Sequence, residues 1–149
     1  MLSKKLLSNL KHVEVIEIPL CGKIKGLYAD GVIAINKHMT NKEKICVLAH
    51  ELGHHFTTYG NILDQSKVEN RKQEHRACAW SYKELIPLRS FLEAHQKGIY
   101  TRYELAEFLE VTEEFLEKAI QYYKKKHGLY YEVDNYLIYF EPLAVLKKV

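Results

Sequence analysis

The sequence lacks any apolar run approaching the roughly 20 residues that a membrane-spanning helix needs. Its N-terminus also lacks the apolar core of a signal peptide. Cysteine is scarce, and Cys21, Cys46 and Cys78 are an odd number without metal-ligand spacing among themselves. Reduced thiols are expected for such a set. These absences argue against a membrane protein and a disulfide scaffold, so we expect a cytoplasmic protein with no membrane partner.

A strong charge of either sign is absent as well. The formal net charge of +3 over 149 residues is too small to indicate nucleic-acid binding. Hydrophobic residues make up 47% and charged residues 28% of the chain, which is the composition of a globular protein. No repeat or low-complexity segment interrupts it. The length predicts a single domain over residues 1–149.

The central feature of the sequence is the motif His50-Glu51-Leu52-Gly53-His54. Residues i and i+4 lie on the same face of a helix, so His50 and His54 can direct both imidazoles at one point. Neutral imidazole is a good zinc ligand, and a catalytic zinc keeps one coordination position for water. Glu51 can reach that water and take its proton. The motif therefore predicts a catalytic zinc site with Glu51 as the base.

The residues around the motif predict a helix from Thr40 to Thr57. Thr40 and Glu43 have the spacing of a capping box, which marks a helix start. Apolar residues then recur at helical spacing and form a core-facing stripe. The stripe consists of Ile45, Leu48, Ala49, Leu52 and Phe56. The two histidines fall on the opposite side, as expected for the wall of a cleft.

A candidate third ligand, Glu74, stands in a second helical segment that ends near Leu85. At helical spacing Glu74 shares a face with small residues, including Ala77, Cys78 and Ser81, so another helix could approach closely there. Two histidines from one helix and a glutamate from the next are the ligands of one large class of zinc peptidases.

These segments together resemble the ImmA/IrrE family of zinc metallopeptidases. The resemblance rests on the HELGH motif, on Glu74-x-x-Ala77 and on Leu85-Ile86-Pro87, with Val32-Ile33-Ala34-Ile35-Asn36 and Ala49 as the lead-in. It implies an α+β, zincin-like fold in which His50, His54 and Glu74 hold one zinc ion and Glu51 is the catalytic base. The known substrates of the family are helix-turn-helix repressors of mobile elements or stress regulons. A protein substrate of that kind is therefore the expected partner.

Cys78 departs from the family pattern, in which Asp or Asn follows the glutamate ligand by four residues. In glutamate-ligand zincins that acid orients a ligand histidine, and such partners affect metal affinity. The thiolate of Cys78 could also complete the zinc sphere and close it to water, which would give a structural site. The role of Cys78 stays open at this point.

A small antiparallel sheet is expected before the motif helix. Residues 13–18, 24–29 and 32–36 read as strands, and Asp30-Gly31 is a strong signal for a two-residue hairpin. In zincins an edge strand binds the substrate by adding the peptide as a further strand. The sequence does not decide which strand does so here. A short amphipathic helix with Leu2, Leu6, Leu7 and Leu10 is expected to precede the sheet.

The segment between the two helices, Tyr59 to Ser66, reads as a polar loop near the cleft. Tyr59, Asp64 and His75 are the candidates for stabilising a tetrahedral oxyanion, although surface positions are the simpler interpretation of each. His55 points about 100° away from the predicted metal and reads as a helix-cap or rim residue rather than a ligand.

Three short helices are expected after Pro87, over residues 88–97, 101–109 and 112–126. The last two have the outline of a helix-turn-helix, which raises the alternative of a DNA-binding regulator. However, the candidate recognition helix begins with Glu113 and Glu114, which oppose phosphate contact. A helical cap on the catalytic half fits better. Residues 129–140 read as a second hairpin rich in tyrosine, which suits sheet packing or a partner surface.

The combined interpretation is a single metallopeptidase domain with a catalytic core (1–87), a helical subdomain (88–128) and a hairpin with a tail (129–149). Its predicted activity is zinc-dependent endopeptidase cleavage of a repressor, with direct nucleic-acid binding not expected. The alternative is a regulator without proteolysis, which binds DNA or sequesters a repressor in the same cleft. The sequence decides neither the substrate and its scissile bond nor the oligomeric state and the activation signal.

Overall fold

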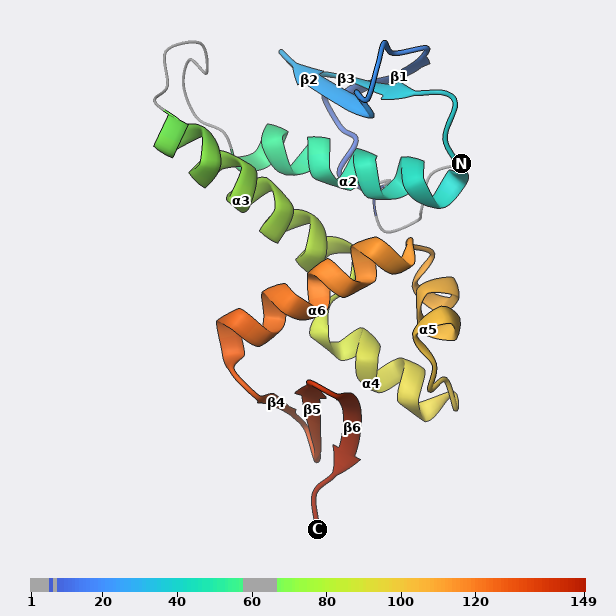
Figure 1. Ribbon diagram of the computed structural model, residues 1–149, viewed down its shortest axis with the longest axis vertical. Coiled ribbons are helices and arrows are strands. Elements are labelled where there is room, and N and C mark those ends of the chain that lie inside the picture. The colour runs from blue at the N-terminus through green and yellow to red at the C-terminus, as the bar shows by residue number, and fades with distance from the viewer. Residues whose placement is uncertain (1–5, 7, 58–66) are drawn as a thin grey trace. The chain divides into compact units, whose positions relative to one another are not determined.

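The computed structural model describes residue 6, residues 8–57 and residues 67–149 (Figure 1). The chain divides into two compact units, Met1–Leu85 and Ile86–Val149. The single-domain organisation stays a prediction. None of the described helices combines the length and apolar character that a membrane crossing requires.

The first unit contains a three-stranded sheet of β1 (Glu14–Ile18), β2 (Gly26–Ala29) and β3 (Val32–Asn36), in the order β1-β3-β2. Strands β2 and β3 form the predicted antiparallel hairpin. At its turn both Asp30 (φ 45°) and Gly31 (φ 80°) have positive φ, as a primed two-residue turn requires.

The expectation of a purely antiparallel sheet is wrong for β1, which pairs with β3 in parallel. The most apolar strand, β3, takes the central position, and its Ile33 and Ile35 are buried. The chain leaves β1 through residues 19–25, a connection longer than a tight turn, and returns along the far edge as β2. The sheet is therefore mixed, with β1 and β2 as its two edges.

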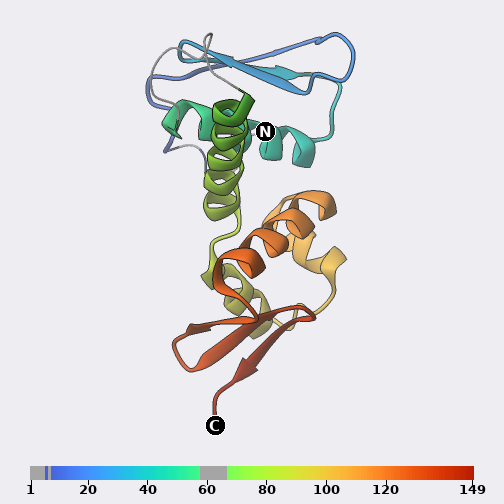
Figure 2. The same ribbon diagram turned by 60° about the vertical axis from the view of Figure 1, so that its left-hand side comes forward.

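Helix α2 (Asn41–Thr57) packs against the sheet, mainly against β2 and β3 (Figure 2). Its predicted capping box is confirmed, because the amide N–H of Glu43 donates to Oγ1 of Thr40 at 3.2 Å. The predicted apolar stripe is buried at Ile45, Leu48, Ala49 and Leu52. Of the expected N-terminal helix, Leu6 is helical and fully buried, whereas Leu2 and Leu7 lie outside the described residues.

Helix α3 (Lys67–Leu85) begins well before Glu74 and runs across α2. Gly53 and Ala77 meet where the helices cross. A Cβ atom on Gly53 would lie 2.4 Å from the carbonyl oxygen of Ala77, so only glycine permits this approach. Phe56 of α2 also stacks on Trp80 of α3, with ring centroids 5.3 Å apart. The crossing fixes which side chains of the two helices face one another.

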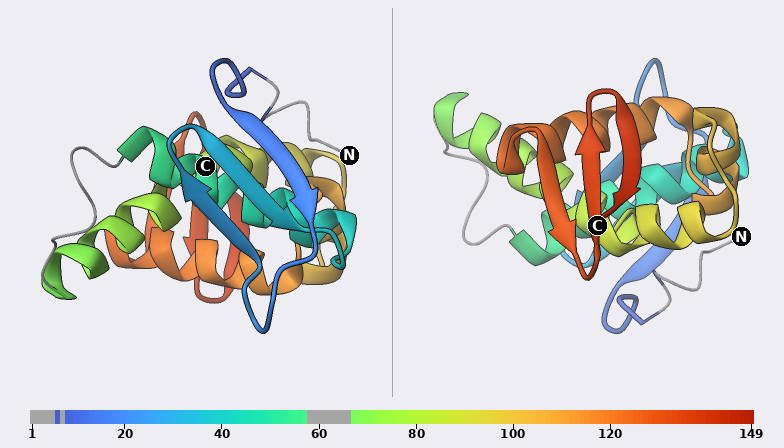
Figure 3. Two further views of the ribbon diagram at one scale, coloured as in Figure 1. Left: turned by 90° about the horizontal axis from the view of Figure 1, so that it is seen from above. Right: turned by 90° about the horizontal axis from the view of Figure 1, so that it is seen from below.

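The second unit contains three helices and an antiparallel sheet in the order β4-β5-β6 (Figure 3). The helices are α4 (Leu88–Gln96), α5 (Arg102–Leu109) and α6 (Glu113–His127), and the strands are β4 (Tyr130–Val133), β5 (Tyr136–Phe140) and β6 (Leu143–Lys147). Thr101 and Thr112 cap α5 and α6 through their hydroxyl oxygens, as predicted. The sheet packs against α4 and α6.

The C-terminal tail predicted after the hairpin is wrong, because residues 143–147 add strand β6 to β5. Pro142, two residues after Phe140, indicates the end of a strand. The apolar stretch after it is short and is followed by basic residues, so no clear signal for a further strand is present in the sequence. The helices of this unit contain a set of buried apolar residues. That set includes Leu105, Leu109, Phe115, Leu116, Ala119 and Ile120. Packing of this unit on the catalytic half stays a prediction.

Candidate metal centre

The structure brings together the three side chains that the sequence selected as metal ligands. Nε2 of His54 lies 2.8 Å from Oε1 of Glu74, and Nε2 of His50 lies 3.1 Å from Oε2 of the same carboxylate. The two Nε2 atoms are 3.2 Å apart. The imidazoles come from successive turns of α2 and the carboxylate from α3, so the helix crossing creates this cluster.

The cluster has the spacing that a zinc ion needs. Two nitrogen ligands at about 2.0–2.1 Å from a tetrahedral zinc are about 3.3 Å apart, close to the 3.2 Å between the two Nε2 atoms. The donors are a carboxylate and two imidazoles, which bind a metal in their neutral form. Catalytic zinc sites use this set of ligands. Glu74 is open to solvent, with 58% of its side chain exposed. The residues therefore fit a zinc ion, and His50, His54 and Glu74 would hold it at a position open to solvent.

Glu51 lies beside this cluster and is buried, with only 8% of its surface exposed. Its carboxylate forms no hydrogen bond with another residue in the described part of the chain. Burial raises its pKa, Glu74 adds to that rise, and the two histidines oppose it. A buried carboxylate without a hydrogen-bond partner is costly unless a metal, a proton or water satisfies it. This carboxylate is therefore suited to accept a proton at the site.

Strand β2 lies directly over Glu51. A Cβ atom on Gly26 would come 2.6 Å from Cγ1 of Val47 and 3.2 Å from Oε1 of Glu51. Glycine at position 26 therefore lets the strand backbone approach the buried carboxylate. Tyr28 lies two residues after Gly26, on the same face of β2. It forms a hydrogen bond with His55, with 2.7 Å between the tyrosine oxygen and Nδ1.

A hollow of about 320 Å³ opens at the cluster and is lined by Tyr28, His54, Asn70, Gln73 and Glu74. The hollow lies between strand β2 and the exposed side of the cluster of His54 and Glu74. Tyr28 of β2 therefore lines the same hollow as His54 and Glu74.

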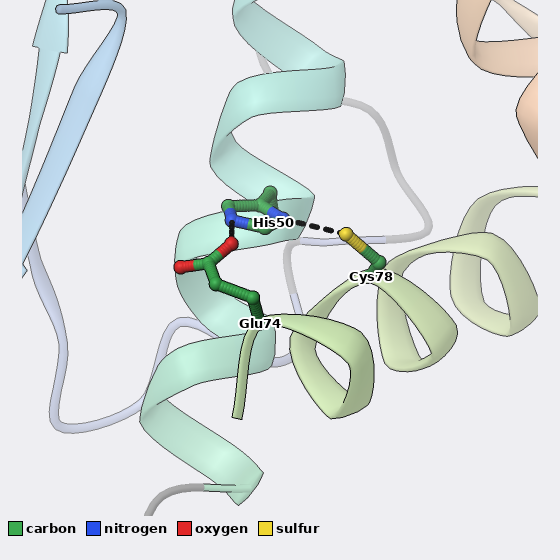
Figure 4. A group of neighbouring side chains, drawn as sticks. All are labelled: His50, Glu74 and Cys78. Atoms are coloured by element: carbon green, nitrogen blue, oxygen red, sulfur yellow. Dashed lines mark hydrogen bonds and ion pairs between the residues drawn. The ribbon is translucent and has the colours of Figure 1, made fainter. Parts of the chain in front are cut away.

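Cys78 lies on the other side of the His50 ring (Figure 4). Its Sγ atom is 3.6 Å from Nδ1 of His50, whereas Glu74 contacts Nε2. His50, Glu74 and Cys78 also offer donor atoms within 4.8 Å of one another. The hydrogen bond to Cys78 and then that to Glu74 raise the pKa of His50 to about 10. In turn the two imidazoles, His50 first, hold the pKa of Glu74 well below its usual range.

The sequence was less informative about the rest of the cleft. Tyr59 and Asp64, two of the oxyanion candidates, lie outside the described residues. His75 is exposed and lines a separate hollow with Arg71, Lys72 and Arg76. His55 contacts Tyr28 rather than the ligand cluster, in agreement with its interpretation as a rim residue. Sequence analysis missed Tyr28, although its alternation with Gly26 on β2 places both on the face toward the motif helix.

A small sheet packed on helix α2, which α3 crosses, together with a His-Glu-His cluster beside a buried glutamate, defines a zincin-like protein of the metallopeptidase type. Residues 12–121 match the family described as the IrrE N-terminal-like domain, Peptidase_M78, and the chain belongs to this family. The resemblance drawn from the motifs is confirmed. A comparison with curated proteins gives no match.

Proposed function

We propose that the protein is a zinc-dependent endopeptidase that binds one zinc ion per chain through His50, His54 and Glu74. The observation that carries this proposal is the convergence of the two Nε2 atoms and the Glu74 carboxylate, within 2.8–3.2 Å of one another, beside the buried Glu51. Membership in a metallopeptidase-type family supports the reaction class.

The residues of the chain divide the chemistry among them. A bound zinc ion would supply a Lewis acid that polarises the scissile carbonyl and lowers the pKa of a nearby water. Glu51 accepts a proton from the attacking water and passes it to the amine nitrogen as the peptide C–N bond breaks. Burial raises the pKa of Glu51, which helps one carboxyl group to accept and then donate this proton.

We place the peptide substrate along strand β2. Within the described sheet β2 has β3 on one side only, so its outer edge can accept a further strand. The same strand carries Gly26 over Glu51 and Tyr28 beside the hollow at His54 and Glu74. A peptide paired with this edge would run past the cluster in an extended conformation.

We further propose a helix-turn-helix repressor of mobile-element or stress genes as the substrate. This part rests on the known substrates of the family. A sheet edge accepts extended chain, so the cleaved segment would be a linker or a locally unfolded stretch of the repressor rather than an intact helix.

The proposal is tested with Glu51→Gln, which removes the base but none of the proposed ligands. The variant should bind one zinc ion per chain and lose cleavage of a co-expressed helix-turn-helix repressor by at least about 100-fold. Its thermal stability should stay equal or rise, because a buried charge has been removed. Glu93→Gln, the same change at an exposed position of α4, is the matched control.

Metal analysis and mass spectrometry of the repressor fragments give the readouts. Cleavage by Glu51→Gln at the wild-type rate would contradict the mechanism. An intact repressor that co-purifies with the wild-type protein would support sequestration instead. Binding to duplex DNA that persists above about 0.15 M salt would support the DNA-binding alternative.

A further inference from the structure

One face of α3 carries Glu74, Cys78 and Tyr82 on successive turns. Glu74 contacts Nε2 of His50 at 3.1 Å, and Cys78 contacts Nδ1 of the same ring at 3.6 Å. Figure 4 shows the imidazole between the carboxylate and the sulfur. Both nitrogens of His50 are therefore held by one helix.

An imidazole that binds a metal through Nε2 stays neutral and carries its hydrogen on Nδ1. That N–H group needs an acceptor, which fixes the tautomer and the direction of the ring. The sulfur of Cys78 lies within range of an N–H···S hydrogen bond and is the acceptor that the described residues provide.

We propose that Cys78 is a positioning residue for His50: its sulfur accepts the Nδ1–H hydrogen and holds the ring with Nε2 toward His54 and Glu74. This inference rests on the proposed zinc-binding function and assigns a role to the residue that replaces the usual Asp or Asn of the family. Cys78 is not a ligand in this arrangement, because its sulfur faces the nitrogen that points away from the Glu74 carboxylate.

Tyr82 supports this role from the next turn of α3. Burial, and after it the neighbouring Cys78, raise the pKa of Tyr82, so its hydroxyl keeps its proton. The side chains of Tyr82 and Cys78 are hydrogen-bonded, and a tyrosine O–H is a donor that helps to hold the sulfur in place. The order of contacts is then Tyr82 to Cys78 to His50.

Sulfur is a weaker acceptor than a carboxylate, so the identity of residue 78 should tune metal affinity. Changes to such partners alter metal affinity by about 10- to 100-fold. Cys78→Ala should weaken zinc binding by at least about tenfold, and Cys78→Asp should restore or exceed wild-type affinity. Cys78→Ser should behave like Cys78→Ala. The Cβ–O bond of serine is shorter than the Cβ–S bond of cysteine, so the serine oxygen would lie farther from Nδ1 of His50 than the roughly 2.9 Å of an N–H···O hydrogen bond.

The experiment measures the zinc dissociation constant of the full chain by competition with a chromophoric chelator. Wild type is compared with the alanine, serine, asparagine and aspartate variants at position 78, and Cys21→Ala is the matched control at an exposed cysteine. The effect of Cys78→Ala should vanish in a His50→Ala background, because the two residues act through one contact. Nitrogen NMR of the zinc-loaded protein should show a protonated Nδ1 on His50.

Unchanged affinity in all four variants, with tight zinc binding by wild type, would overturn the inference and leave the proposed function standing. A wild-type protein that binds no zinc would overturn both. With cobalt in place of zinc, an intense sulfur-to-cobalt band that disappears in Cys78→Ala would show that Cys78 is a ligand, which would also overturn the positioning role. Melting curves of the serine and asparagine variants identify any loss caused by misfolding alone.

Discussion

Position 53 has no room for a side chain. A Cβ atom there would lie 2.4 Å from the carbonyl oxygen and 2.9 Å from the Cα atom of Ala77. Both are backbone atoms of a helix, so neither can move aside without shifting α3. The glycine inside the HELGH motif therefore controls the distance between the proposed ligands on α2 and the proposed ligand on α3.

Gly53→Ala should destabilise the first unit by about 1–3 kcal/mol, although alanine normally favours a helix over glycine by about 1 kcal/mol. Urea unfolding followed by the fluorescence of Trp80 measures this effect, because Trp80 is the one tryptophan of the chain and stacks on Phe56 across the crossing. Adding Ala77→Gly should not restore stability, because the close contacts are with the backbone. A variant as stable as wild type would mean that the helices can separate without cost.

Sequence analysis could select His50 and His54 as candidate ligands and Glu51 as the candidate base because spacing along one helix is a local property. Glu74 required the resemblance to a known family in addition, since a ligand on a second helix has no fixed spacing from the first. Alternation along β2 indicates which face Tyr28 occupies, but the contacts of Tyr28 with His55 and of Cys78 with His50 could not be predicted. They depend on the angle at which α3 and β2 cross α2, which no local periodicity encodes.

At the scale of elements, β2 connects the sheet to the site. It is an edge strand, it packs on α2, and its Gly26 allows the backbone to approach Glu51. The hairpin of β2 and β3 was predicted from Asp30-Gly31, whereas the parallel pairing of β1 was not. A turn signal reports only on the two strands that it joins, so the position of β1 depends on tertiary packing.

Gly26→Ala should reduce kcat/KM by at least about tenfold while the protein stays folded, because a methyl group would press on both Val47 and Glu51. The double variant Gly26→Ala with Val47→Ala separates these two contacts. It should regain stability, because the 2.6 Å contact is with a side-chain methyl of Val47, but not activity. Full activity in the double variant would show that the space beside Glu51 is not required.

At the scale of the whole molecule, the chain consists of two compact units, and every proposed zinc ligand belongs to Met1–Leu85. The sequence predicted a boundary between the catalytic core and the helical subdomain at residue 87, because Pro87 interrupts the helical pattern there. It did not predict the strand β6 that completes the second sheet. Short strands beside a proline carry little local signal.

Zinc should therefore protect the first unit selectively. At a free zinc concentration of 100 times the dissociation constant, binding stabilises the folded state by about 2.7 kcal/mol. Hydrogen exchange should slow in α2 and α3, and the amides of β4, β5 and β6 should exchange at the same rate with and without zinc. A chelator should reverse the protection. Equal protection of both units would instead indicate that they unfold together.

If the substrate pairs with strand β2 as proposed, the hairpin that carries Gly26 and Tyr28 has a consequence for control of the reaction. An edge strand recognises main chain, which every protein has but which folded proteins keep engaged in their own hydrogen bonds. The rate of proteolysis would then depend on how often the target protein unfolds locally rather than on the amino-acid sequence of the target. A signal that destabilises the target protein could therefore start cleavage, and a partner that stabilises the target could prevent it. Neither would require a change in the proposed protease.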